Sequence, residues 1–270
     1  MMTRSGWLRN SVVIAAGVMF AMLAMTPAAY PRAKKKVEPT PTETPTPTAT
    51  PTPEAKVWNF DQDKAGEVAS GWKAISGDWQ VIPDPSAPSP PNTFGLPPGR
   101  LLTSLIHGLN YSTMAVVDDP TEYSNFTMEA SFKPAGGRFD CSGGIVFRYV
   151  DDKNFYLLSA GCPSDYFTLS RMSGGNATVL SQKVVPTDRD TWYKIKVVAA
   201  GDRFTCYNDD KMIYDASDSK IAQGRIGLWA SNDSQARFDN VTIIKPLAGA
   251  EGGAGSATPA APPPLPPPPH

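Results

Sequence analysis

The chain is poor in histidine, cysteine and net charge. Its 270 residues include two histidines and three cysteines, and its formal net charge is −1 at pH 7. The histidines, His107 and His270, are too few for a zinc site built from several imidazoles. A charge balance near zero, without a basic stripe interleaved with aromatic residues, argues against a nucleic-acid partner.

Several common catalytic motifs are also missing. The sequence has no Gly-x-Ser-x-Gly elbow, no Walker motif and no dinucleotide-binding glycine motif. Only three glutamates, Glu67, Glu122 and Glu129, lie between residues 57 and 245. Because glycoside hydrolysis normally needs two carboxylates that flank the scissile bond, we expect no catalytic residue, and Glu129 is the one candidate acid if there is catalysis.

The N-terminal residues predict export. Two arginines precede the uncharged apolar run Val12–Met25, and small residues follow it. This pattern is typical of a secretory signal peptide over residues 1–29. The alternative is an uncleaved membrane anchor, because the apolar stretch is about 19 residues long and basic residues 32–36 follow it. In either case the membrane would be contacted only through this segment.

Proline-rich segments flank a single domain. Residues 30–56 form a linker in which Pro39–Pro53 is a Thr-Pro alternation, which favours an extended polyproline II spacer about 45–50 Å long. Residues 246–270 are rich in Gly, Ala and Pro and are predicted to be a disordered tail. The domain is therefore residues 57–245, and we expect a monomer that is secreted or held at the cell surface or in the periplasm.

A β-hairpin is predicted in the middle of the domain. The apolar runs Ile145–Val150 and Phe155–Ala160 flank a polar turn. A two-residue loop at Asp151-Asp152 would put Cys141 directly opposite Cys162. A four-residue loop would make the two cysteines diagonal neighbours. Side chains alternate along a strand, so both registers place the two thiols on one face.

Cys141 and Cys162 are therefore predicted to form a disulfide. Directly opposed strand residues can have Cβ atoms about 4.5–5.5 Å apart, which is close to disulfide geometry. Such a bond would contribute about 3 kcal/mol and fits an exported protein. The alternative is two buried free thiols. Cys206 alternates with Phe204 and is predicted to be a buried strand thiol.

The whole domain is predicted to be all-β. Residues 125–133 alternate between apolar and polar side chains, as in a half-buried antiparallel strand. Some fifteen such runs are too many for an immunoglobulin-type sandwich and favour a two-sheet antiparallel jelly roll. Outside the hairpin the runs are Trp58–Phe60, Trp72–Ile75, Trp79–Ile82, Leu101–Ile106, Thr113–Val117, Phe126–Phe132, Tyr166–Arg171, Thr178–Lys183, Trp192–Val198, Phe204–Tyr207, Lys211–Tyr214, Arg225–Trp229 and Ala236–Ile244.

An ordered set of short motifs resembles a known superfamily. The motifs are Gly-Asp-Trp-Gln-Val (77–81), Gly-Gly-Ile-Val-Phe-Arg-Tyr (143–149), Asn-Phe-Tyr-Leu-Leu (154–158), Trp-Tyr-Lys-Ile-Lys-Val (192–197), Gly-Arg-Ile-Gly-Leu-Trp (224–229) and Ala-Arg-Phe-Asp-Asn-Val (236–241). In this order they resemble the concanavalin A-like lectin/glucanase superfamily, most closely its 3-keto-disaccharide hydrolase domain, a laminin-G-like jelly roll. The resemblance implies a curved sandwich with carbohydrate recognition on its concave face. The Glu-x-Asp-x-(x)-Glu strand motif of the glucanase branch is absent.

Four residues are candidates to bind a glycan on that face. Arg148 should point opposite to its neighbours Phe147 and Tyr149, and a sheet-centre arginine needs a polar or anionic partner. The other candidates are Trp229, Tyr156 and Glu129. Either Tyr156 or Phe155 faces outward, depending on the register. Simple packing of Trp229 and the tyrosines is the alternative.

A structural calcium site is a further expectation from the resemblance. Asp61 follows Phe60 on the first predicted strand, and Asp239 follows Phe238 on the last. In this superfamily the first and last strands lie side by side, and calcium sites often use that junction. Calcium prefers several oxygen ligands, so two carboxylates alone could equally be part of a polar turn. No other cofactor is expected.

These observations lead to three functional hypotheses. The first is an exported, non-catalytic carbohydrate-binding module for a glycan or a cell-envelope polysaccharide. The second is a glycoside hydrolase that acts on keto-disaccharides or related glycans. The third is a structural or adhesive domain that binds protein at the cell surface.

Overall fold

The computed structural model describes residues 53–88, 99–105, 112–162, 164–231 and 233–246. The predicted signal, residues 39–52 of the Thr-Pro repeat, residues 247–270 of the C-terminal tail and both histidines lie outside these ranges. All regular secondary-structure elements in the described ranges are β-strands. These ranges contain no helix that is long and apolar enough to cross a membrane.

The described part of the domain contains fifteen strands. They are β1 (Ala55–Trp58), β2 (Trp72–Ser76), β3 (Trp79–Pro83), β4 (Arg100–Ser104), β5 (Thr113–Val117), β6 (Phe126–Gly136), β7 (Cys141–Asp151), β8 (Asn154–Cys162), β9 (Tyr166–Ser173), β10 (Asn176–Val184), β11 (Tyr193–Ala200), β12 (Arg203–Asn208), β13 (Lys211–Ser217), β14 (Arg225–Ala230) and β15 (Gln235–Ile244). β1 begins at Ala55. Residues 55 and 56 therefore belong to a sheet and not to the predicted linker.

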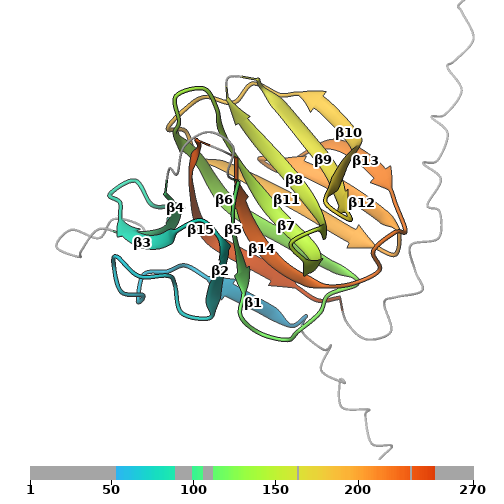
Figure 1. Cartoon of the computed structure of the whole chain (residues 1–270), viewed down its shortest axis with the longest axis horizontal. Helices are drawn as coiled ribbons and strands as arrows, with labels where there is room; N and C mark the ends of the chain where they lie inside the picture. Colours follow the sequence, from blue (N-terminus) through green and yellow to red (C-terminus); the bar gives the residue numbers. More distant parts are fainter. Residues whose placement is uncertain (1–52, 89–98, 106–111, 163, 232, 247–270) are drawn as a thin grey trace, which may run out of the picture. The chain divides into compact units, whose positions relative to one another are not determined.

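The strands form two antiparallel sheets that pack face to face (Figure 1). The eight-stranded sheet has the order β13-β12-β11-β6-β15-β4-β3, and β1 pairs with β15. The seven-stranded sheet has the order β10-β9-β8-β7-β14-β5-β2. Strands far apart in sequence, such as β5 and β14, are neighbours. This arrangement confirms the predicted two-sheet antiparallel jelly roll.

The core lies between the two sheets and follows from the alternation along each strand. In β6 the apolar side chains of residues 126, 128, 130 and 132 are buried, whereas Thr127, Glu129 and Ser131 lie on the outer face. Aromatic rings from both sheets meet in the core. Phe147 stacks on Tyr156 with ring centroids 5.3 Å apart and contacts Phe204 of the opposite sheet at the same distance. Such contacts add to the hydrophobic stabilisation of the sandwich.

The predicted hairpin is formed by β7 and β8, but it contains a bulge. Cys141 pairs with Cys162 and Phe147 pairs with Tyr156, as the shorter-loop register requires. At the tip, however, Asp151 pairs with Asn154, so the loop is Asp152-Lys153 and the predicted loop at Asp151-Asp152 is wrong by one residue. β7 therefore has two more residues than β8 between these pairs, which is a β-bulge.

Candidate functional site

Arg148 points into the sandwich, because it lies in the bulge of β7. Its φ of 47° is rare for a residue other than glycine. The side chain is 2% exposed, and its guanidinium donates to the carbonyl oxygens of Ser124 at 2.7 Å and Ile221 at 2.9 Å. A third bond of 2.5 Å reaches the carbonyl oxygen of Gly201. The prediction that Arg148 faces outward is therefore wrong.

The other three candidate glycan-binding residues lie apart, one in the core and one on the outer face of each sheet. Tyr156 is fully buried in the core, where its hydroxyl donates to a carboxylate oxygen of Asp218 at 2.6 Å. Glu129 lies on the outer face of the eight-stranded sheet, and Trp229 lies on the outer face of the seven-stranded sheet. The predicted convergence of Arg148, Glu129 and Trp229 on one face is therefore wrong.

An apolar cluster covers the outer face of the seven-stranded sheet. Its buried members are Met114, Val116, Val146, Tyr149, Phe155 and Leu157, and Trp229 packs against them half-buried. The register thus settles that Phe155, not Tyr156, faces outward. These side chains come from β5, β7, β8 and β14, which lie next to one another in the sheet (Figure 1). We call this set the outer aromatic cluster.

A polar pocket lies at the end of β14 next to this cluster. It has a volume of about 440 Å³ and is lined by Asp118, Asp119, Pro120, Glu122 and Arg225. The guanidinium of Arg225 lies over the ring of Tyr149, 5.2 Å from its centroid. Carboxylates accept hydrogen bonds and a guanidinium donates them. The pocket therefore offers both kinds of partner to a ligand rich in hydroxyl groups.

Arg148 supports this pocket from inside the sandwich. The pocket is lined by residues of the loop 118–124 and by Arg225, which directly follows the loop 218–224. These two loops pair through an amide–carbonyl bond of 2.9 Å from Tyr123 to Gly224. The carbonyl groups of Ser124 and Ile221, which accept hydrogen bonds from Arg148, belong to one loop each. The buried guanidinium thus links the loop that lines the pocket to the loop that precedes Arg225.

Asp119 is held as a carboxylate at one wall of the pocket. Lys56 of β1 bonds to it at 2.8 Å, and the amide of Thr121 donates to it at 2.6 Å. The hydrogen bond from Lys56, together with those from Thr121, lowers the pKa of Asp119 to about 2. Lys56 belongs to the eight-stranded sheet and Asp119 follows β5 of the other, so this ion pair joins the two sheets.

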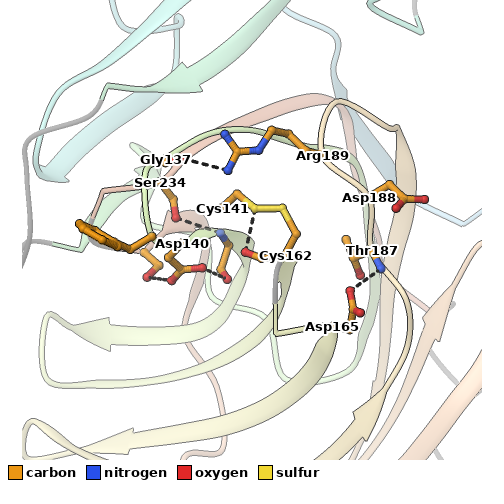
Figure 2. The surroundings of a disulfide bond; sticks show 12 residues. Gly137, Asp140, Cys141, Cys162, Asp165, Thr187, Asp188, Arg189 and Ser234 are labelled. Atoms are coloured by element: carbon orange, nitrogen blue, oxygen red, sulfur yellow. Dashed lines mark hydrogen bonds between the residues drawn. A yellow bond between two sulfur atoms is a disulfide. The ribbon is translucent and has the colours of Figure 1, made fainter.

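The disulfide lies at the opposite end of β7. Cys141 and Cys162 are bonded, with Cα atoms 5.2 Å apart, and Cys206 is a buried free thiol. Figure 2 shows the disulfide beneath the bond from Arg189 to the carbonyl of Gly137, which measures 2.9 Å. The disulfide is confirmed, but eight residues of β7, roughly 26 Å of strand, separate it from the Tyr149–Arg225 contact.

The predicted calcium ligands are engaged with backbone amides. Asp61 accepts from the amide of Arg100 at 3.0 Å, and the buried Asp239 accepts from the amide of Asn240 at 2.7 Å. The first and last strands, β1 and β15, do pair. Within the ranges that the structure describes, no group of three or more His, Cys, Asp or Glu side chains is placed to hold a metal ion. The calcium site remains a prediction.

Sequence comparison assigns the domain to a family. The sequence model of the 3-keto-alpha-glucoside-1,2-lyase-like domain matches residues 53–244, well over half of the 270-residue chain. The chain belongs to this family. The match spans all fifteen strands and confirms the resemblance that the ordered motifs indicated.

Two relatives of the 3-keto-alpha-glucoside-1,2-lyase-like domain come from Bacillus subtilis. The levanase of strain 168 is 35% identical over 122 residues, which are 44% of this chain and 18% of the levanase. The chain thus matches less than a fifth of that relative's length. The carbohydrate-binding module CBM66 is 26% identical with a TM-score of 0.52, over 68% of this chain and 99% of the module. The likeness to the module therefore extends over its whole fold.

The residues that line the pocket were not singled out in the sequence analysis. Asp118-Asp119 directly follows the predicted strand Thr113–Val117 and Arg225 begins the predicted strand Arg225–Trp229, and the local pattern indicates a binding role for neither. One signal was present, because three carboxylates fall within residues 118–122 directly after a strand. Arg225 also shares the face of Trp229 in the alternation of β14. Their convergence depends on which strands are neighbours, which the spacing of motifs does not reveal.

Proposed function

We propose that this domain binds carbohydrate without cleaving it, in the pocket of Asp118, Asp119, Glu122 and Arg225. The observation that carries the proposal is the likeness to CBM66, a carbohydrate-binding module that aligns over 99% of its length. A family domain whose whole fold matches a binding module is a natural candidate for the same kind of task, although a fold alone does not specify a function.

The chemistry of the pocket supports the proposal. A sugar ring presents hydroxyl groups around its edge and C–H groups on its faces. Ionised carboxylates and a guanidinium are suitable partners for the hydroxyls, and a pocket with a few convergent polar groups beside aromatic side chains is typical of ligand sites. Here the ring of Tyr149 holds Arg225 in place.

The state of Asp119 excludes it as the general acid of a glycosidase and suits a role in binding. A glycosidase needs a general acid whose pKa is raised so that it is protonated near neutral pH. The pKa of Asp119 is instead lowered to about 2, first by its hydrogen bond with Lys56. The group is therefore a permanent hydrogen-bond acceptor at neutral pH and suits recognition of sugar hydroxyls.

The proposal includes export from the cytoplasm. The Cys141–Cys162 disulfide supports it, because structural disulfides persist mainly in oxidising compartments. The ligand would then be a glycan outside the cell. Levan is the first polymer to test, because the relative with 35% identity is named a levanase.

Titration calorimetry of the full-length chain with levan and other polysaccharides tests the proposal. We expect saturable binding that Arg225→Gln weakens at least tenfold, since the variant removes the cationic donor of the pocket. Arg203→Gln is the matched control, because Arg203 is an exposed arginine on the other sheet paired with Asp215. A folded chain that binds no glycan would refute the proposal.

A lyase or hydrolase is the second candidate. It is favoured by the family description and by the three carboxylates that line the pocket, of which Glu122 hydrogen-bonds the side-chain amide of Gln223 at 2.6 Å. Incubation with a 3-keto-α-glucoside distinguishes the two candidates. Release of products that is abolished by Glu122→Gln would favour catalysis, and an intact substrate would leave binding alone.

A further inference from the structure

A second pocket lies on the other side of Asp119. It has a volume of about 420 Å³ and is lined by Lys56, Val57, Trp58, Gly71, Val117 and Asp119. Asp119 lines both this pocket and the first one. The two hollows are therefore adjacent, with one carboxylate between them, and a ligand that fills the first can extend into the second.

The second pocket offers an apolar floor and a polar wall. Trp58 is half-buried, and its indole is fixed by an edge-on contact with Trp72 at 5.6 Å between ring centroids. The wall is the ion pair of Lys56 with Asp119, in which the ammonium donates and the carboxylate accepts at 2.8 Å. An indole face next to one donor and one acceptor suits a neutral sugar ring, which stacks its C–H face and hydrogen-bonds its edge.

This pocket is also held in shape before any ligand arrives. The amide of Asp118 donates to the carbonyl of Gly71 at 2.8 Å, which fixes the β5 end of the pocket to the loop before β2. β1 is fixed from the other side by its pairing with β15. A site whose walls are fixed in advance loses less conformational entropy on binding.

We propose that the second pocket is a further sugar subsite, so that the domain binds a glycan segment of at least two units across Asp119. The inference rests on the proposed carbohydrate binding by the first pocket. It predicts a dependence of affinity on chain length that a single-pocket site would not show.

Calorimetry of the full-length chain with fructose and with a levan-derived trisaccharide measures this dependence. In the wild type we expect the trisaccharide to bind about tenfold more tightly than the monosaccharide, equivalent to about 1.4 kcal/mol. Val57 is 60% exposed and lines only the second pocket. Val57→Arg would fill that pocket from the surface and should bring the ratio of the two dissociation constants to about one.

Val184→Arg is the matched control, because Val184 on β10 is also 60% exposed and lines neither pocket. It should keep the tenfold ratio. Thermal unfolding of each variant verifies that it is folded, and Trp58→Phe, which keeps an aromatic contact with Trp72, should give a ratio between one and ten.

Equal affinities of the wild type for both sugars would overturn the second subsite and leave the first pocket in place. A tenfold ratio that survives Val57→Arg would also overturn it. A folded chain that binds neither sugar, nor levan, nor any of the other polysaccharides would overturn both the subsite and the proposed function, so the two failures are distinguishable.

Discussion

Arg148 shows at the scale of one residue how a charge in the core can serve a surface site. A buried guanidinium is costly unless its donors are satisfied. Here three loop carbonyl groups accept from its terminal nitrogens, its Cζ atom lies 5.0 Å from the ring centroid of Phe204, and only its buried Nε has no hydrogen-bond partner among the described residues. Desolvation by burial lowers the pKa of Arg148 from its usual value. The residue links three loops, of which one lines the pocket and another directly precedes Arg225.

We expect Arg148→Met to destabilise the fold and loosen the pocket loops. The change leaves three carbonyl oxygens without a donor, which should lower the free energy of unfolding by about 2–4 kcal/mol. Urea unfolding measures this loss, and amide exchange of residues 119–124 and 221–224 should become faster. Arg203→Met, on the exposed arginine of β12, should leave both measurements near wild type. Unchanged exchange in the two loops of the Arg148 variant would contradict this role.

Asp119 gives a prediction for acid stability. Its pKa in the folded protein is about 2, below the ordinary 3.8, because of its hydrogen bonds with Lys56 and Thr121. A depressed pKa means that the pair stabilises the fold fully above about pH 4 and that this contribution is lost as the pH falls towards 2. Denaturant unfolding at several pH values should show a smaller loss over this window in Asp119→Asn than in the wild type. An equal fall of the free energy of unfolding with pH in the variant and the wild type would exclude a stabilising role for the ion pair of Lys56 and Asp119.

At the scale of elements, the β7–β8 hairpin separates what the sequence could predict from what it could not. Alternation and the positions of Cys141 and Cys162 were sufficient for the strands and the disulfide, because both depend on local pattern. The bulge at Arg148 was not predictable. It requires a positive φ at a residue other than glycine. This conformation is fixed by hydrogen bonds from the Arg148 side chain to loops that are 24 to 73 residues away in sequence. This single bulge reverses the expected direction of the Arg148 side chain, the main candidate to bind a glycan.

The disulfide should stabilise this hairpin and leave Cys206 reduced. Replacing both bridging cysteines by alanine should lower the free energy of unfolding by about 2–4 kcal/mol, since the unfolded chain is no longer cross-linked. Burial raises the pKa of Cys206, so its thiol should resist alkylation at pH 8 until the protein unfolds. Non-reducing peptide mapping verifies the pairing, and any bridge to Cys206 would contradict the register of β7 and β8.

At the scale of the whole domain, the pockets lie where the two sheets meet. β1 of the eight-stranded sheet supplies Lys56 and Trp58, whereas the seven-stranded sheet supplies Arg225 and the loop after β5. The family and the sandwich could be predicted because core patterning is spread along the chain. The pockets could not, because their residues come from four separate stretches, residues 56–58, 71, 117–122 and 225, that only the strand order brings together. Glu129, on the outer face of the eight-stranded sheet, became a candidate only because that strand order was unknown.

The central claim is that a glycan binds across Asp119 at this junction. A nitrogen–proton correlation titration of the full-length chain with a levan-derived trisaccharide tests it most directly. We expect the largest amide shift changes at residues 56–58, 118, 119, 121, 122 and 225. Changes that cluster around Glu129, or no change at a saturating concentration of the sugar, would contradict it.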